Sequence, residues 1–85
     1  MKIITKLNYE VTKKRGLITE ETSIREFVMK LEEEVQEFIC AALHEKGDFN
    51  HELGDIILVC LNIAKHYDVD IEKQLLTNIF KNMKR

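Results

Sequence analysis

The sequence predicts an all-α domain, and three observations support this fold class. Apolar residues recur with helical spacing along most of the 85 residues, no proline interrupts them, and β-strand patterns are weak. The length fits a single domain spanning residues 1–85. Because a domain this small buries only about 60% of its unfolded surface, we expect a four-helix bundle that self-association completes.

The first helix is predicted from about residue 3 to residue 14. Ile3, Leu7 and Val11 recur every four residues and form one apolar stripe along it. Gly16 is placed to end this helix, because glycine readily adopts the left-handed conformation found after a helix C-terminus.

The second helix begins with a capping box, in which Ser23 and Glu26 bond each other's backbone N–H groups. Helical apolar spacing continues for about five turns, and Gly47 is the expected end. The apolar positions are Ile24, Phe27, Val28, Leu31, Val35, Phe38, Ile39, Ala42 and Leu43.

Two shorter helices follow. The third is capped by Asp48 or Asn50 and ends near Tyr67, and the fourth is capped by Asp70. Short connections favour antiparallel neighbours, so the second and third helices should form a hairpin. The apolar positions are Leu53, Ile56, Val59, Cys60, Ile63 and Ala64 in the third helix, and Ile71, Leu75, Ile79 and Met83 in the fourth.

Charge and composition exclude several classes of protein. The formal net charge is −2 and the pI is about 5.9, so the chain lacks the basic excess that binding to a nucleic-acid duplex requires. No apolar run approaches the ~20 residues of a membrane-spanning helix. The first residues lack the apolar stretch of a secretory signal, and a cytoplasmic protein is expected. Cys40 and Cys60 are expected to be free thiols.

Four glutamates lie in the middle of the second predicted helix. At ~100° per residue, Glu33, Glu34 and Glu37 fall within an arc of about 100°, and Glu34 lies at the edge of the apolar stripe. Glu32 falls on the other side of that stripe and is expected in solvent. A solvated helix face is one explanation of the cluster. The other is a bound cation, which would relieve the mutual repulsion of the carboxylates.

A second acidic pair, Glu52 and Asp55, begins the third predicted helix near its buried face. Ionised carboxylates there are costly without a partner, although the helix dipole also favours acidic residues at a helix N-terminus. Facing helices of a hairpin lie about 8–10 Å apart, so the two clusters should share one cavity. Such a set of oxygen ligands suits Mg²⁺.

Two other metal centres fit the sequence poorly. A di-iron carboxylate bundle uses Glu-x-x-His pairs, and none of the three histidines has a glutamate three residues before it. A zinc site on Cys40 and His44 lacks further ligands of the right type nearby. His66 falls near the face of Asp55 and is expected to be structural.

Two acidic segments resemble the E-E-x-x-E and E-x-x-D signature of MazG-like nucleoside triphosphate pyrophosphohydrolases. They are KLEEEVQE at 30–37 and ELGDII at 52–57. The resemblance continues through NIAK at 62–65, VDIE at 69–72 and the tail at 78–85, and it covers residues 31–85. These enzymes form the all-α NTP pyrophosphatase superfamily with dimeric dUTPases and phosphoribosyl-ATP pyrophosphatase. The resemblance implies a MazG-like four-helix bundle. Because the apolar stripes of four helices exceed what one small core can cover, we expect a homodimer or a dimer of dimers.

The resemblance also implies a reaction and the residues that perform it. Water attacks between the α and β phosphates of an NTP or dNTP, which yields the monophosphate and pyrophosphate, and house-cleaning of non-standard nucleotides is one role it suggests. The Mg²⁺ ligands would be Glu33, Glu34, Glu37, Glu52 and Asp55, with Mn²⁺ as a substitute ion. The catalytic residues would be Glu33, Glu34 and Glu52, the last as a ligand or as the residue that positions the attacking water. The substrate-binding residues would be Lys30, Asn62, Lys81 and Arg85.

These substrate-binding residues each have a structural alternative. Lys30 shares an arc with the acidic cluster but could be an ordinary surface lysine, and Asn62 could be a partner-satisfied interface amide. Lys81 and Arg85 could simply complement the dipole of the last helix. Two alternative functions also stay open: a non-catalytic helical dimerisation or nucleotide-sensing module, and phosphoribosyl-ATP pyrophosphatase, whose usual histidine after the E-x-x-D segment is missing here.

Overall fold

A computed structural model describes all 85 residues, with four helices and no strand. Helix α1 spans Lys2–Lys14, α2 spans Ile24–Leu43, α3 spans Phe49–His66 and α4 spans Ile71–Met83. The all-α prediction is therefore confirmed. None of the four helices combines the length and the apolar character that crossing a membrane requires. Both cysteines are free and exposed, as predicted.

Local side-chain caps start three of the helices at the predicted positions. At α2, the Glu26 N–H donates to Ser23 Oγ at 3.2 Å and the Ser23 N–H donates to Glu26 Oε2 at 2.8 Å, which completes the capping box. Asp48 caps α3 by accepting from two backbone N–H groups, and Asp70 caps α4 by accepting from the Lys73 N–H. These bonds satisfy N–H groups that have no partner inside the helix.

The end of α2 differs from the prediction, whereas the end of α1 agrees with it. Helix α2 ends at Leu43, four residues before Gly47, because Glu45 adopts a left-handed conformation with φ of 54°. The Lys46 N–H then donates to the Cys40 carbonyl at 3.2 Å, which closes the helix terminus. Gly16 follows α1 with φ of 74°, in the left-handed conformation expected of it.

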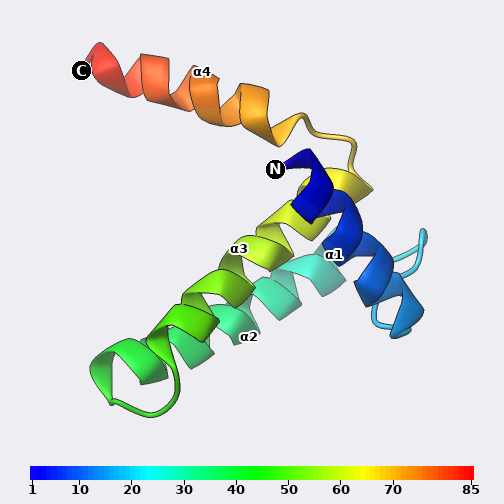
Figure 1. Cartoon of the computed structure of the whole chain (residues 1–85), viewed down its shortest axis with the longest axis vertical. Helices are drawn as coiled ribbons and strands as arrows, with labels where there is room; N and C mark the ends of the chain where they lie inside the picture. Colours follow the sequence, from blue (N-terminus) through cyan, green and yellow to red (C-terminus); the bar gives the residue numbers. More distant parts are fainter.

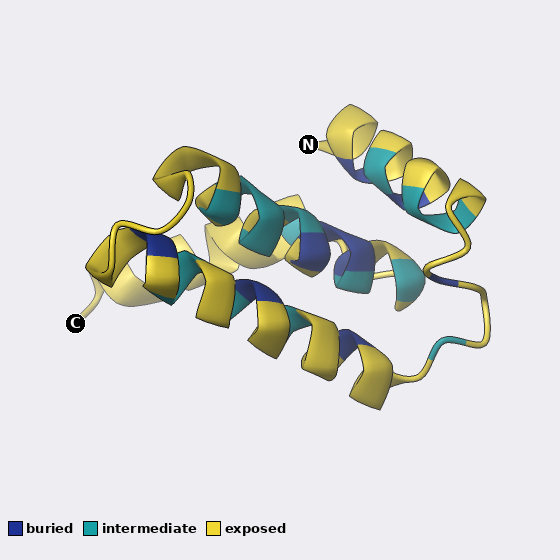
Figure 2. Cartoon of the chain, turned by 90° about the horizontal axis from the view of Figure 1, so that it is seen from below, coloured by how far each residue is buried: buried dark blue, intermediate teal, exposed yellow.

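Helices α2 and α3 form the predicted antiparallel hairpin, and α1 packs across it near the N-terminal end of α2 (Figure 1). The main buried cluster lies where α1 meets the hairpin and consists of Tyr9, Ile18 and Phe27, with Ile63 packed against it. The other buried apolar residues belong to the hairpin and are Ala41, Val59, Leu61 and Ala64. Figure 2 shows that buried residues line the facing sides of these three helices and that most other positions are exposed. Ile18 belongs to the segment between α1 and α2, so this segment is anchored to the core.

The apolar stripe of α1 does not face this core. Ile3 is 83% exposed and Leu7 is 63% exposed, whereas Thr5 and Tyr9 are the buried residues of the helix. Tyr9 joins the core and its hydroxyl lies 2.9 Å from Nδ1 of His66 on α3. The contacts with α3 therefore decide the orientation of α1, and the apolar stripe remains on the surface.

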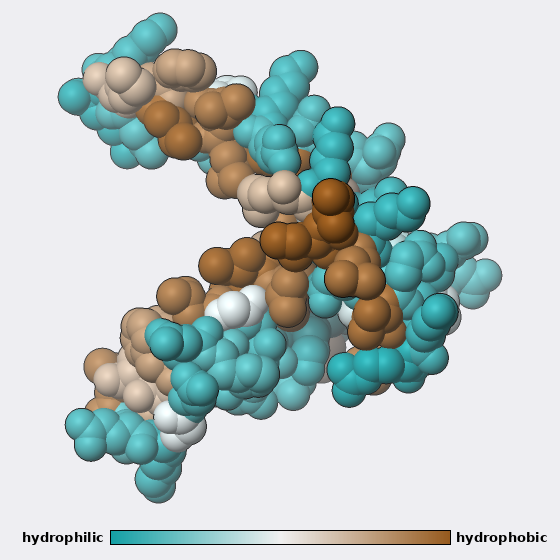
Figure 3. All heavy atoms as spheres, viewed as in Figure 1, coloured by the Kyte–Doolittle hydropathy of each residue, from teal (hydrophilic) through white to brown (hydrophobic).

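Helix α4 diverges from the other three helices beyond its first turn (Figure 1). It has no buried residue, and it makes no extensive contact with another helix. A single chain is thus a three-helix body with a projecting fourth helix rather than a closed four-helix bundle. Figure 3 shows apolar side chains along the inner edge of the angle between α4 and the hairpin.

Candidate functional site

The three predicted carboxylates of α2 lie together in the middle of that helix. One oxygen each from Glu33, Glu34 and Glu37 falls within 4.8 Å of the others, and we call these residues the α2 cluster. Glu34 is only 6% exposed, whereas Glu32 on the same helix is exposed, as the helical angles predict. The burial of Glu34 places a carboxylate on the face of α2 that meets the rest of the protein.

A second acidic group stands at the start of α3. Glu52 and Asp55 lie with His51 so that one ligand atom of each falls within 4.8 Å of the others, and these residues are the α3 cluster. Both carboxylates are half-buried, and His51 Nε2 lies 3.1 Å from Asp55 Oδ2. His51 was not predicted as a site residue, although its separation of four residues from Asp55 places the two on the same face of a helix.

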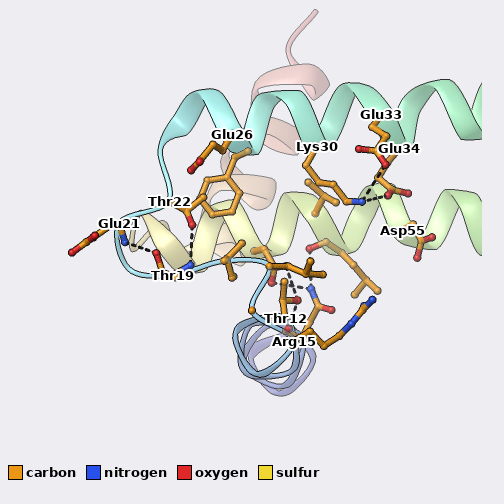
Figure 4. Close-up of a pocket in the computed structure, with 18 residues that line it drawn as sticks. Thr12, Arg15, Thr19, Glu21, Thr22, Glu26, Lys30, Glu33, Glu34 and Asp55 are labelled. Carbon is orange, nitrogen blue, oxygen red and sulfur yellow. Dashed lines mark hydrogen bonds and ion pairs between the residues drawn. The ribbon is translucent and has the colours of Figure 1, made fainter.

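The hairpin brings the two clusters together. The negative charge of Glu34, and to a smaller extent that of Glu52 on the facing helix, raises the pKa of Glu37 above its ordinary value. Glu33, Glu34 and Asp55 also line one pocket of about 800 Å³ (Figure 4). The predicted juxtaposition of carboxylates from α2 and α3 is therefore present in the structure.

Lys30 is the basic residue that contacts the α2 cluster. Its Nζ lies 2.9 Å from Oε1 of Glu34 and 3.6 Å from Oε1 of Glu33 (Figure 4). The hydrogen bond to Glu34 raises the pKa of Lys30, so the ammonium form is favoured. The lysine lines the pocket and neutralises part of the acidic charge.

Two carboxylate oxygens in this region are buried and have no hydrogen-bond partner. They are Oε2 of Glu34 and Oε2 of Glu52, one from each cluster. A buried ionised oxygen without a partner is costly, and a divalent cation would supply the missing interaction. Apart from the imidazole of His51, which contacts Asp55, the potential ligands of both clusters are carboxylates, and this set fits a hard ion such as Mg²⁺ or Mn²⁺.

Asn62 lies at the inner wall of the same pocket and is 7% exposed. Its Oδ1 accepts from Asn8 Nδ2 at 2.8 Å, and its own Nδ2 donates to Thr12 Oγ1 at 3.2 Å. Asn8 Nδ2 also donates to the Leu58 carbonyl at 3.1 Å. The amide of Asn62 is therefore satisfied by α1 at the interface between α1 and α3, which was the structural alternative to recognition of a base.

The other two predicted substrate-binding residues, Lys81 and Arg85, lie away from the acidic clusters. Lys81 is in the last turn of α4 and Arg85 follows that helix, and neither lines the pocket. Within one chain the structure brings Lys30 and Asn62 to the site, but not these two cations.

Several residues of the pocket were not expected from the sequence. They belong to the end of α1 and to the segment that leads to α2, and they include Arg15, Leu17, Thr19 and Thr22. Inside this segment, the Thr19 N–H donates to Thr22 Oγ1 at 2.8 Å. Their position depends on how the chain turns at Gly16, which no local spacing pattern specifies.

Comparison with known proteins identifies a family for the chain. The family model described as the MazG nucleotide pyrophosphohydrolase domain matches residues 10–85, which include both acidic clusters and every residue that lines the pocket except Asn8. No curated protein and no solved structure matched the chain significantly.

Proposed function

The chain belongs to the MazG nucleotide pyrophosphohydrolase family, and from this premise we propose that it hydrolyses a nucleoside triphosphate to its monophosphate and pyrophosphate with the aid of Mg²⁺. The observation that carries the proposal is the pair of acidic clusters facing each other across the hairpin, with one buried, unpartnered oxygen in each. A pocket of about 800 Å³ beside them has room for a nucleotide.

The carboxylates of both clusters would hold the cation. Those residues are Glu33, Glu34, Glu37, Glu52 and Asp55. When bound, Mg²⁺ neutralises phosphate charge and lowers the pKa of a coordinated water. Its preference for carboxylates, waters and phosphate oxygens agrees with a site that lies beside an open pocket.

The protein's own residues then orient the reactants. Glu52 is half-buried on the α3 side of the site, and besides the oxygen that would hold the cation its carboxylate has a second one, to which we assign the positioning and deprotonation of the attacking water. The water oxygen forms a bond to the α phosphorus, the bond from that phosphorus to the bridging oxygen breaks, and pyrophosphate leaves with the electron pair. We also assign Lys30 to a phosphate oxygen of the substrate, because its ammonium would be released from Glu34 if that carboxylate held the cation.

The reaction is tested by measuring pyrophosphate release from a panel of canonical and modified NTPs and dNTPs, with Mg²⁺ and with EDTA. We expect release that depends on Mg²⁺ and that a Glu34→Gln, Asp55→Asn double variant loses by at least about a thousandfold, because these changes remove charged ligands from both clusters. Calorimetry with Mg²⁺ alone should show loss of binding in the same variant.

Glu32→Gln is the matched control, because Glu32 is an exposed glutamate on the same helix outside the α2 cluster. It should retain both metal binding and turnover. If folded wild-type protein binds Mg²⁺ but turns over no nucleotide, the alternative of a nucleotide-sensing or dimerisation module is favoured. Equal activity in the double variant and the wild type would contradict the assigned site.

We also propose that the protein acts as a homodimer or a dimer of dimers. A compact 10.0 kDa monomer is expected to expose about 5,200 Å², whereas this chain exposes 6866 Å². The excess is about twice the ~800 Å² that each partner buries in an interface of standard size. A second copy of the chain, packed against α4 and the outer face of α1, would cover it.

A further inference from the structure

The pocket extends well beyond the acidic clusters, to the end of α1 and the segment that follows it. We propose that Arg15, at this far side, binds the pyrophosphate portion of the substrate's triphosphate chain. The inference rests on the proposed function and adds to it a specific residue for recognition of the leaving group. It starts from the charges that line the pocket.

Acidic side chains outnumber basic ones in the lining of the pocket. The carboxylates are Glu21, Glu26, Glu33, Glu34 and Asp55, and the cations are Arg15 and Lys30. Lys30 already pairs with two of these carboxylates, at 2.9 Å and 3.6 Å. Arg15 forms no ion pair. It is therefore the one cation of the pocket that is free to meet an anionic ligand.

The backbone fixes the position of Arg15. Its N–H donates to the Val11 carbonyl at 3.1 Å, and the Leu17 N–H donates to the Thr12 carbonyl at 3.2 Å, so the chain is held on both sides of the Gly16 turn. Thr12, one helical turn earlier, accepts from Asn62 of α3. In Figure 4 the Arg15 side chain extends from the end of α1 toward the side of the pocket that carries Asp55.

The chemistry of the substrate requires such a cation. A nucleoside triphosphate carries about four negative charges, so its Mg²⁺ complex remains an anion when it approaches an acidic pocket. Cleavage between the α and β phosphates then adds charge to the departing pyrophosphate. A guanidinium group remains protonated and presents a planar set of donors that matches two phosphate oxygens. Arg15 supplies this group opposite the α2 cluster.

The test measures the binding of inorganic pyrophosphate in the presence of Mg²⁺ by calorimetry, and separately measures KM and kcat for the best nucleotide. We expect Arg15→Ala to weaken pyrophosphate binding at least about tenfold, which is the scale of one lost charge-assisted contact. Arg15→Lys should fall between Arg15→Ala and wild type, because it keeps the charge but loses the planar donors. The binding of Mg²⁺ alone should not change.

Lys14→Ala is the matched control, because Lys14 is the neighbouring exposed cation of α1 and does not line the pocket. Equal effects of Arg15→Ala and Lys14→Ala would overturn the assignment, since only the overall charge would then matter. Unchanged pyrophosphate affinity in Arg15→Ala, or no pyrophosphate binding by the wild type, would overturn it as well. Arg15-dependent binding without nucleotide turnover would instead refute the proposed reaction and leave the anion site in place.

Discussion

At the scale of single residues, Glu34 is the centre of the site. It is nearly buried, one of its oxygens meets Lys30, and the other has no partner. Leaving a charged oxygen unpartnered destabilises the folded protein, and the neighbouring carboxylates of Glu33 and Glu37 add repulsion. A bound cation would remove this unfavourable energy, and the proposed metal site would therefore couple the stability of the fold to metal binding.

The repulsion between these carboxylates makes the stability of the metal-free protein depend on pH. The charge of Glu34 raises the pKa of Glu37 above 4.5 in the folded protein. The folded state thus takes up this proton more readily than the unfolded state, so stability falls as pH rises through the window above 4.5 and increases again on acidification. We expect Glu37→Gln, measured by thermal unfolding in EDTA, to raise the melting temperature at neutral pH and to flatten this dependence.

Glu32→Gln is the control for this experiment, because it removes the same charge from the exposed side of α2. Its melting curve should keep the wild-type dependence on pH. With saturating Mg²⁺ the order should reverse, and wild type should gain more stability than Glu37→Gln, which lacks a ligand. A lower melting temperature of Glu37→Gln at neutral pH in EDTA would contradict the repulsion argument.

The residues predicted correctly are those whose positions follow from helix geometry alone. The 100° step between residues places Glu34 inside and Glu32 outside, and the structure agrees. The same reasoning could have found His51, which lies one turn before Asp55. Arg15 could not be found in this way, because its distance from α2 depends on the path of the segment between the two helices.

At the scale of elements, the side-chain caps of α2, α3 and α4 were predictable because each depends on residues within one turn. The orientation of α1 was not. Its apolar stripe suggested one buried face, but the hydroxyl of Tyr9 and the amide of Asn8 find partners on α3 and turn another face inward. Specific polar contacts between elements outweighed the apolar periodicity.

Asn62 is the residue of α3 that holds α1 in this orientation, and replacing it should therefore affect stability. Asn62→Ala removes bonds to Asn8 and Thr12 and should cost about 1–3 kcal/mol of unfolding free energy. Denaturant unfolding measures this cost. Well below the melting temperature, the ranking of bases in the nucleotide panel should not change.

Asn50→Ala provides the comparison, because Asn50 is an exposed amide of the same helix. It should leave the unfolding free energy within about 0.5 kcal/mol of wild type. If Asn62→Ala is as stable as this control but alters the ranking of bases, then Asn62 recognises the substrate directly and the structural assignment is wrong.

At the scale of the whole molecule, the unusual feature is the exposed apolar surface of α4. Five large apolar side chains of this helix are between 42% and 73% exposed. They are Leu75, Leu76, Ile79, Phe80 and Met83. Helical spacing puts them on one side of α4, and nothing within the chain covers them. Self-association is the simplest way to remove such a surface from water.

The proposed assembly also bears on Lys81 and Arg85. Because α4 diverges from the hairpin, these cations do not contact the acidic clusters of their own chain. If they bind phosphate, as the family resemblance implies, they must do so in the site of a second copy. Each active site would then combine two carboxylate clusters from one protomer with two cations from its partner.

A mixing experiment tests this arrangement. A Lys81→Ala, Arg85→Ala variant and a Glu34→Gln, Asp55→Asn variant should each be inactive, while light scattering should show that both remain dimers. After subunit exchange, the mixture should regain about a quarter of the wild-type sites, because half of randomly exchanged dimers are hybrids and each hybrid contains one complete site.

As a control, the acidic-site variant mixed with a chain carrying all four substitutions should stay inactive. A dimeric mixture that exchanges subunits but regains no activity would rule out a contribution from the partner's α4, and a monomeric wild-type protein would rule out the assembly itself.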